Sequence, residues 1–239
     1  MTEDKNKVFE SYFSNRSVNN NFYLNYNIPE YLHKILPKDK SSAILDIGCG
    51  MGQLISALKK QGFTDVEGID ISKEAINLCK LRYLDVFEIA NLEDFCSMAK
   101  KRYDFIIMSH VLEHLEKSSI IRTLQLIKQY LMKPEGSLMV MVPNAQSNTG
   151  CYWAYEDFTH NTIFTAGSLC FVLKSAGFES IEFLDPDGLE ASWPIIKWLR
   201  KFFLFIYKAN IIFWNRVTNS SFHCPSPQIF TYELKALAK

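Results

Sequence analysis

The sequence predicts an α/β fold, a doubly wound parallel sheet with helices on both faces. Short apolar runs alternate with stretches of helical periodicity between residues 43 and 133, and repeated β-α-β units require parallel strands joined by right-handed crossovers. A glycine-rich turn, Gly48 to Gly52, joins the first apolar run to the first helix. With 239 residues, 48% of them hydrophobic, the chain can build one sizeable core.

The periodicity of the apolar residues, together with glycines and prolines that interrupt it, predicts where the strands and helices lie. We expect strands at 43–47, 66–69, 86–89, 103–108, 137–142, 178–184 and 228–237. We expect helices at 53–61, 73–83, 92–100, 118–131 and 165–176. A turn at 185–188 precedes the last strand, so a final hairpin would set the last two strands antiparallel.

Two segments lie outside this alternation. Residues 1–40 are rich in aromatic residues and asparagine, with short helical patterns at 7–13 and 29–36 and no strand alternation. They form either a cap packed on the sheet or a lid over a ligand. Residues 41–239 form the main domain, in which residues 189–222 are a basic and apolar helical insertion.

The glycine turn has the architecture of a nucleotide site, since glycines let the backbone approach a ligand and the helix start offers free N–H groups. Its G-x-G-x-G spacing differs from that of dinucleotide sites, and no Lys-Ser/Thr follows as in a P-loop. Asp70 ends the second strand 20 residues after Gly50 and can accept both ribose hydroxyls. The ligand therefore carries adenosine without a pyrophosphate cradle. The alternative is a plain strand-to-helix turn.

Four longer segments carry a family resemblance: I-L-D-I-G-C-G-M-G, E-G-I-D-I-S, Y-D-F-I-I-M-S-H-V-L-E-H-L and L-M-K-P-E-G-S-L-M-V-M-V-P-N. In order and spacing, over residues 41–184, they resemble the motifs of class I S-adenosylmethionine-dependent methyltransferases. The resemblance implies a Rossmann-like, seven-stranded sheet whose last strand is antiparallel. It also implies S-adenosyl-L-methionine, a sulfonium cation without phosphate, as cofactor.

The resemblance and the strand ends together give the expected cofactor contacts. They are Asp46, Gly48, Cys49, Gly50, Gln53, Asp70, Ile71, Asn91, Leu92 and Ser109. Gly48 and Gly50 would approach the methionine part, and Asp70 would hold the ribose. Asn91 and Leu92 would flank the adenine, although the family often has Asp at position 91.

Histidines gather at the expected mouth of the site, where imidazole suits base work near neutral pH. We expect His160 to be the general base, Asp157 to orient it or to contact the substrate, and His114 to assist. Tyr152, Trp153 and Tyr155 precede this group and suit a sugar or a quinone-like ring, or else cover the sheet edge.

The segment D-F-T-H-N-T-I-F that contains His160 resembles bacterial glycan and O-antigen sugar methyltransferases, and also small-RNA 2′-O-methyltransferases. In those RNA enzymes E-x-x-E-H and a distant histidine bind a divalent metal. Here His110 replaces the first glutamate, so we expect no bound metal. Glu113, His114 and His160 are the set that would hold one.

Charge is unevenly distributed although the net charge is zero. From residue 191 onward there are seven Lys/Arg and one Glu. From Trp193 to Arg216 a helix would align Lys197, Arg200, Lys201, Lys208 and Asn215 on one narrow face and leave a broad apolar remainder. This pattern is typical of a helix in a membrane interface. Packing on the same domain or in a homodimer is the alternative, and the narrow positive charge argues against DNA.

Six scattered cysteines without C-x-x-C indicate reduced thiols, and the N-terminus has no signal-peptide pattern. We therefore expect a cytoplasmic protein, peripheral at the inner face of the membrane if the stretch from Trp193 binds lipid. The favoured activity is O-methylation of a sugar in a surface polysaccharide or lipid-linked glycan. The alternatives are methylation of a lipophilic phenol of the ubiquinone-pathway type, RNA 2′-O-methylation, and a ligand-binding scaffold without turnover.

Overall fold

The computed structural model describes residues 12–15, 26–190, 193–220 and 228–239. Parts of the expected N-terminal cap and its 7–13 helical pattern lie outside the described residues. Within them, a seven-stranded sheet has the order β3-β2-β1-β4-β5-β7-β6. The strands are β1 (Ile44–Ile47), β2 (Val66–Asp70), β3 (Val86–Glu88), β4 (Tyr103–Ser109), β5 (Met132–Pro143), β6 (Ile181–Phe183) and β7 (Glu233–Ala238).

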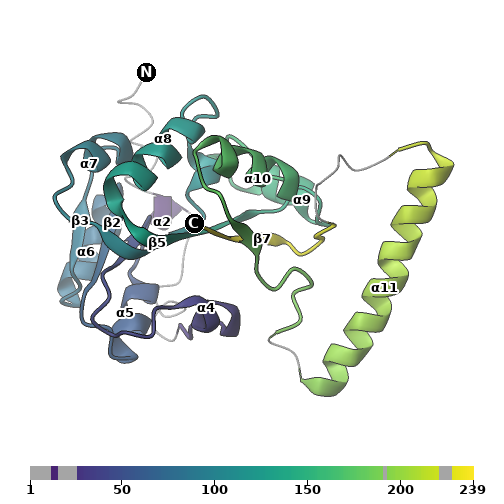
Figure 1. Cartoon of the computed structure of the whole chain (residues 1–239), viewed down its shortest axis with the longest axis horizontal. Coiled ribbons are helices and arrows are strands. Elements are labelled where there is room, and N and C mark those ends of the chain that lie inside the picture. Colours follow the sequence, from purple (N-terminus) through teal and green to yellow (C-terminus); the bar gives the residue numbers. More distant parts are fainter. Residues whose placement is uncertain (1–11, 16–25, 191–192, 221–227) are drawn as a thin grey trace.

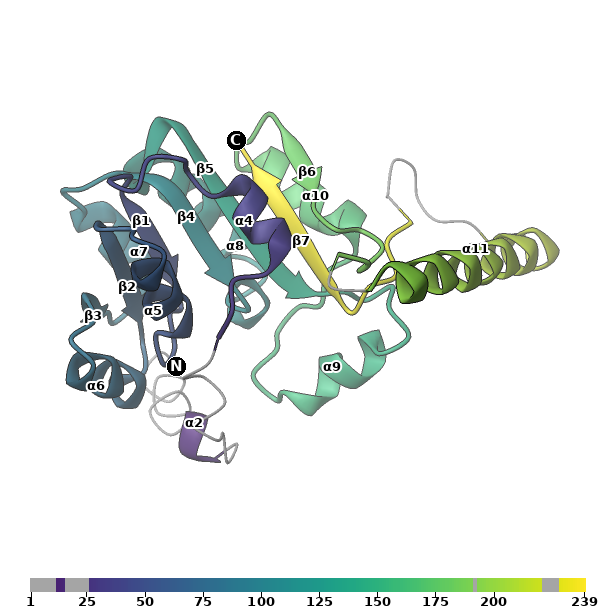
Figure 2. The ribbon, with the colours of Figure 1, turned by 90° about the horizontal axis from the view of Figure 1, so that it is seen from below.

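The pairing confirms the predicted fold class. Strands β1 to β5 pair in parallel, whereas β7 runs antiparallel to both β5 and β6. Helices cover both faces, as Figures 1 and 2 show. They include α4 (Glu30–Ile35), α5 (Gln53–Lys60), α6 (Lys73–Leu81), α7 (Leu92–Met98), α8 (Ile120–Leu126) and α10 (Ala166–Ser175).

Side-chain alternation explains why two cores form. Leu45 of β1 belongs to the cluster under α8 and α10, whereas its neighbour Ile44 belongs to the cluster under α4 and α5. Successive strand residues point to opposite faces, so a strand covered on both sides is mostly apolar, as β1 is apart from Asp46. Since all of β1 is buried, this strand is central and its carboxyl end opens on the middle of the sheet.

Several boundaries differ from the sequence-based expectation. The strand expected at 178–184, for example, is β6 (Ile181–Phe183). The helix expected at 118–131 ends as one π-helical turn, η2 (Ile127–Leu131), and β5 begins at Met132 instead of at 137. Met132 pairs with Tyr103, and the pairing resumes at Ser137 after an irregularity. That irregularity contains Pro134, which has no N–H to donate to the ladder. The last strand begins at Glu233, not at 228.

Three smaller elements surround the carboxyl end of the sheet. They are α2 (Tyr12–Asn15), the 3₁₀ turn η1 (Leu112–His114) and α9 (Gly150–Glu156). The sequence did not lead us to expect α9.

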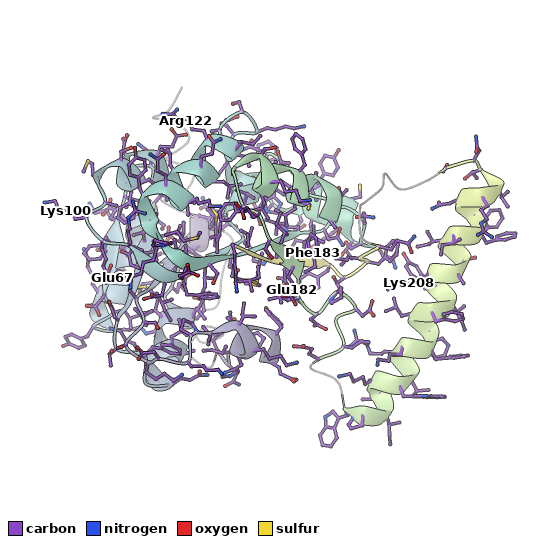
Figure 3. All side chains as sticks on the ribbon, viewed as in Figure 1. Glu67, Lys100, Arg122, Glu182, Phe183 and Lys208 are labelled. Atoms are coloured by element: carbon purple, nitrogen blue, oxygen red, sulfur yellow. The ribbon has the colours of Figure 1, made fainter. Side chains whose placement is uncertain are left out.

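The long helix α11 (Pro194–Val217) stands apart from the body of the protein in Figures 1 and 2. It contains no buried residue. Lys208 is directed from α11 toward the body (Figure 3) and forms an ion pair with Asp187. Among the described residues, no helix is long and apolar enough to cross a bilayer.

Candidate active site

The glycine turn after β1 adopts backbone angles that favour glycine. Gly48 has a φ of +72° and Gly50 a φ of +49°. A Cβ atom on Gly48 would lie 2.2 Å from a methyl carbon of Val111, and one on Gly50 would lie 3.3 Å from the Phe13 ring. Side chains at these positions would therefore be strained and would fill the space in front of the turn.

Asp70 connects the turn to the end of β2. One of its carboxylate oxygens accepts from the Gly50 N–H at 2.8 Å, and the other accepts from the Ser72 N–H, also at 2.8 Å. Burial raises the pKa of Asp70, although these backbone hydrogen bonds oppose the shift. Each oxygen keeps a second lone pair, so the carboxylate can still accept from ribose hydroxyls.

A cavity of about 270 Å³ opens in front of the turn and is called the donor cavity below. Six predicted cofactor residues line it: Gly48, Gly50, Asp70, Ile71, Asn91 and Leu92. Tyr12 and Phe13 of α2, together with His110 and Val111, also contribute to its wall. The donor cavity thus combines a glycine turn, a carboxylate and apolar walls, which suits an adenosine group.

Four other predicted cofactor residues lie elsewhere. Gln53 and Ser109 line the neighbouring cavity instead, and Asp46 and Cys49 line neither cavity. The Cys49 side chain points into the core. Its sulfur lies so close to Gly68 that a Cβ atom on that glycine would be 2.8 Å from it. The expected cofactor contacts of Asp46 and Cys49 therefore stay a prediction, and Cys49 would have to make its contact through the main chain. Burial, with Asp70 nearby, raises the pKa of Asp46 to about 8.

Asn91 has a structural role in addition to the expected one. It is the N-cap of α7, where its side-chain oxygen accepts from the Asp94 N–H at 2.8 Å. Helix capping of this kind satisfies a backbone donor that would otherwise lack a partner. The same oxygen retains one lone pair for an adenine amine, so the cap restricts but does not remove the expected contact.

A second cavity of about 550 Å³, the acceptor cavity below, adjoins the first. The two share Gly48, Gly50, His110 and His114, with Tyr12 and Phe13 of α2. Aromatic groups from Trp153 and Tyr232 form part of its wall. The side-chain oxygen of Gln53, also at this cavity, is buried and has no partner among the described residues.

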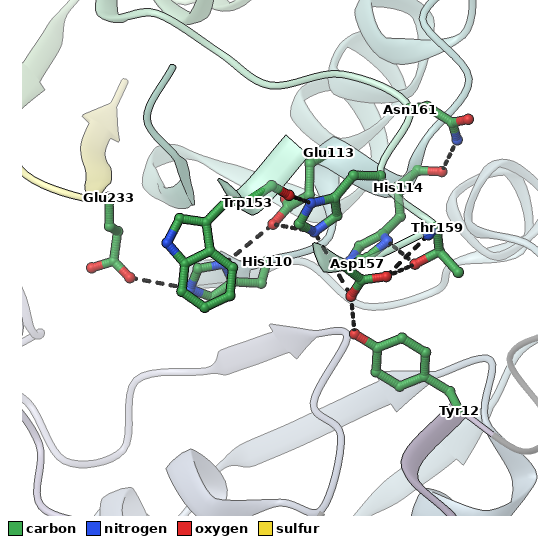
Figure 4. A network of polar contacts seen from close by, with 10 residues as sticks. Tyr12, His110, Glu113, His114, Trp153, Asp157, Thr159, Asn161 and Glu233 are labelled. Carbon is green, nitrogen blue, oxygen red and sulfur yellow. Dashed lines mark hydrogen bonds and ion pairs between the residues drawn. The ribbon is translucent and has the colours of Figure 1, made fainter. Parts of the chain in front are cut away.

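His110 bridges two buried carboxylates (Figure 4). Its Nδ1 lies 3.2 Å from a Glu113 oxygen, and its Nε2 lies 3.1 Å from a Glu233 oxygen. Desolvation lowers the pKa of His110, but the hydrogen bonds to both glutamates outweigh it and raise the pKa to about 10. His110 is therefore an imidazolium at neutral pH and cannot serve as a base. Its backbone has a φ of +55°, in the left-handed region that non-glycine residues rarely adopt.

His160 and His114 lie together, with their ring centres 4.7 Å apart. The Nδ1 of His160 donates to the Trp153 carbonyl at 2.7 Å, because a carbonyl oxygen only accepts. Thr159 donates its hydroxyl hydrogen to Asp157 at 2.6 Å, so its oxygen accepts from the Nδ1 of His114 at 2.8 Å. In the neutral form of both rings, Nε2 is therefore the nitrogen that carries the lone pair.

Asp157 lines the acceptor cavity, where it can contact a substrate, but it is not hydrogen-bonded to His160. The Nε2 of His160 lies 3.9 Å from an Asp157 oxygen, too far for a hydrogen bond. The carboxylate accepts instead from Thr159 and, at 2.5 Å, from the Tyr12 hydroxyl. Burial raises the pKa of Asp157, but these hydrogen bonds outweigh it and lower the pKa to about 2. The Trp153 carbonyl takes over the orienting role.

Glu113, His114 and His160 also meet a geometric condition for a metal site. One ligand atom from each lies within 4.8 Å of the others. The second oxygen of Glu113 is buried without a hydrogen-bond partner among the described residues. With a lone pair on each Nε2 in the neutral rings, this set fits a divalent ion that accepts nitrogen and oxygen ligands. The adjacent imidazolium of His110 opposes such binding by charge repulsion.

Sequence reasoning missed two members of this site. Glu233 reaches His110 from the antiparallel strand β7, and Tyr12 reaches Asp157 from the N-terminal segment. Neither has a local signal, since 123 and 145 residues separate them from their partners. The pattern of residues 1–40 predicted either a cap on the sheet or a lid over a ligand, and the pattern of residues 228–237 predicted only a strand.

Comparison with known proteins identifies the family to which this chain belongs. A family model for a methyltransferase domain matches residues 21–182, more than half of the chain. The chain belongs to this family. It is an S-adenosylmethionine-dependent methyltransferase, as its motifs led us to expect.

Curated relatives of this methyltransferase carry the name ubiquinone biosynthesis O-methyltransferase. The protein of that name from Aeromonas salmonicida is 28% identical over 61% of this chain and 71% of its own length. The one from Hydrogenovibrio crunogenus is 31% identical over 38% of this chain and 44% of its own length. The chain thus spans less than half of the second relative.

Solved structures share the fold of this methyltransferase at low identity. A methyltransferase from Archaeoglobus fulgidus has a TM-score of 0.59 and 19% identity, covering 98% of this chain and 94% of that chain. A DhpI-SAH complex has a TM-score of 0.60 and 13% identity, covering 100% and 96%.

Proposed function

We propose that this methyltransferase methylates a phenolic hydroxyl on a lipophilic aromatic acceptor. The observation that carries the proposal is the contact between the two cavities at Gly48, Gly50 and the histidines. Aromatic walls from Trp153 and Tyr232 suit a flat ring. The names of the curated relatives support this acceptor, which the sequence alone ranked second to a sugar.

Methyl transfer to a hydroxyl requires the protein mainly to position the two substrates and to remove the proton of the acceptor. S-adenosylmethionine supplies the methyl group as a sulfonium, whose sulfur keeps the electron pair of the broken C–S bond. Asp70 and the glycine turn hold the adenosine and methionine parts. The acceptor oxygen forms the new C–O bond, and His160 takes the acceptor's proton at Nε2. The Trp153 carbonyl holds the imidazole in the tautomer that this transfer requires.

A base of this kind favours a phenol over an alcohol. A phenol has a pKa near 10, within reach of imidazole, whereas the proton of an alkyl hydroxyl is held far more tightly. The acceptor cavity also contains the carboxylate of Asp157 and adjoins Glu113 and Glu233. These groups repel polyphosphate chains, which argues against RNA.

A glycan hydroxyl is the second candidate acceptor. The segment around Asp157 to His160 resembles sugar methyltransferases, and its carboxylate and imidazoles can hold sugar hydroxyls. In this reading Gln53 offers its unpartnered oxygen to the acceptor.

A methyl-transfer screen separates these acceptors. The full chain is incubated with labelled S-adenosylmethionine and, in parallel, an alkylated catechol, a lipid-linked glycan fraction and an RNA duplex. We expect label in the catechol product, and at least roughly a hundredfold slower labelling when His160→Ala replaces the wild type. Label only in the glycan would establish the second candidate. Label only in RNA would reject both.

A further inference from the structure

Helix α11 carries a large apolar surface that the other described residues leave uncovered. The helix has 24 residues, among them five Lys/Arg and no Asp or Glu. Trp198 is 67% exposed and Phe205 is 70% exposed. Exposed apolar surface of this extent marks an interaction site, because soluble proteins rarely present it to water.

Among the described residues, the hydrogen bonds and ring contact that join α11 to the body lie on one side of the helix. The Tyr207 hydroxyl donates to Asn148 at 2.7 Å, and its ring packs at 5.5 Å against Phe230. Lys208 donates to Asp187 at 2.7 Å. Asn148 follows β5, and Phe230 precedes β7. Pro143 at the end of β5 and Tyr232 just before β7 line the acceptor cavity, so α11 is attached close to that cavity.

The apolar side chains occupy the opposite side. At about 100° per residue they span an arc of about 140°, and Ile196, Phe203 and Trp214 widen it to about 200°. The members of the narrower arc are Ile195, Trp198, Leu199, Phe202, Phe205, Ile206, Ile212, Phe213 and Val217, all exposed. Lys197, Arg200, Lys201 and Lys208 lie on the body side or at its margin, and Arg216 in the last turn is the cation inside the arc.

We propose that α11 lies in the interface of an anionic lipid membrane, with the apolar arc inserted among the acyl chains. The helix is about 36 Å long at 1.5 Å per residue, so it would lie along the membrane surface. Its cations would meet lipid phosphates at the level where long side chains reach headgroups. Indole rings at Trp193, Trp198 and Trp214 have the amphipathic character that this depth favours.

A second copy of the chain fits this surface less well. A helix pair covers an apolar stripe of about 100°, which would leave much of the arc in water. Pairing two copies also brings like charges together, because α11 has no acidic residue to oppose its cations. A lipid surface meets both requirements, since it surrounds a broad arc and carries the opposite charge.

Liposome flotation of the full chain tests the proposal. Vesicles of phosphatidylcholine alone are compared with vesicles that also contain phosphatidylglycerol. We expect flotation with the anionic vesicles and at least roughly tenfold weaker binding for the double variant Phe202→Glu and Phe205→Glu. The matched control is Phe171→Glu, because Phe171 is equally exposed on α10 and lies outside α11. Calorimetry with S-adenosylmethionine checks that each variant is folded.

A second variant tests whether the cations of α11 are needed for binding to anionic lipids. Lys201→Gln with Arg216→Gln should weaken binding to anionic vesicles and leave binding to neutral vesicles unchanged. Flotation of the Phe202→Glu, Phe205→Glu variant at wild-type level would overturn the proposal. So would sedimentation of the wild type as a dimer that the same two substitutions dissociate, since a second copy would then cover the arc.

Discussion

The Nδ1 atom of His160 lies 2.7 Å from the carbonyl oxygen of Trp153, so that Nε2 carries the lone pair in the neutral ring. A main-chain carbonyl thus performs the orienting function that a carboxylate often has in such sites. Trp153 belongs to α9, and its ring lines the acceptor cavity. One residue therefore both sets the tautomer of the base and contacts the space for the acceptor.

Replacement of His160 tests the base. We expect His160→Ala to lower kcat about 10²- to 10⁴-fold, the usual contribution of a general base, with little change in S-adenosylmethionine affinity. The control is His33→Ala, because His33 lies on α4 and contacts Gln61 outside both cavities. Turnover of His160→Ala at the wild-type rate would assign the proton transfer to another group.

Replacement of Asp70 tests the ribose contact. Asp70→Asn keeps the size of the side chain and removes its charge, and hydrogen bonds to charged groups contribute about 1.5–3 kcal/mol. We expect S-adenosylmethionine to bind about 10- to 100-fold more weakly, as measured by calorimetry. Glu182→Gln on β6, far from the donor cavity, should bind as the wild type does. Unchanged affinity in Asp70→Asn would place the ribose elsewhere.

The buried carboxyl of Asp46 makes stability depend on pH. Its pKa rises from 3.8 to about 8 on folding, because burial and the neighbouring Asp70 disfavour the charged form. A raised pKa contributes stability that is complete below pH 3.8 and is lost as pH rises through about 8. Relative to Asp46→Asn, the wild-type free energy of unfolding should fall across this window in urea titrations without cofactor.

Asp104 provides the control of opposite sign. Burial raises its pKa, but the hydrogen bond from Lys133 and that from the Ala43 N–H lower it overall. The stability it contributes is therefore present above its unfolded pKa and is lost as pH falls. Asp104→Asn should lose stability relative to the wild type near neutral pH and not in strong acid. A parallel response of the two variants would contradict both assignments.

A metal titration tests the set formed by Glu113, His114 and His160. We expect no stoichiometric Zn²⁺ binding by the metal-free chain in calorimetry, because the His110 imidazolium opposes it. Tight binding that Glu113→Gln weakens at least roughly tenfold would instead show that this set holds the ion. Glu135→Gln, at the irregular start of β5, is the control. Equal binding by the wild type and Glu113→Gln would show that the ion uses other ligands. Loss of methyl transfer in chelator, restored by the ion, would add a catalytic role.

The sequence pattern predicted correctly those features that depend on consecutive residues. The apolar run before Gly48 predicted β1, and the acidic end of the next run predicted that Asp70 faces the donor cavity. Both depend on neighbours in sequence. Cys49 shows the limit of this reasoning, because its neighbours line the donor cavity and its own side chain turns into the core.

Long-range contacts had no such signal. His110 and Glu113 are three residues apart and were grouped correctly, but Glu233 joins them only because β7 runs antiparallel beside β5. That contact makes His110 a cation and removes it from the candidates for the base. The pairing partner of an ionisable group, and hence its charge, is a property of the tertiary fold.

By itself the sequence determined the order of strands and helices, the glycine turn, the methyl donor and the amphipathic character of α11. These follow from periodicity and from residues close together in the chain. The tertiary structure decided that Tyr12 and Glu233 enter the site, that a carbonyl orients His160, and that α11 turns its apolar arc away from the body. The reason is physical: charge state, tautomer and exposure depend on which distant groups come within contact distance.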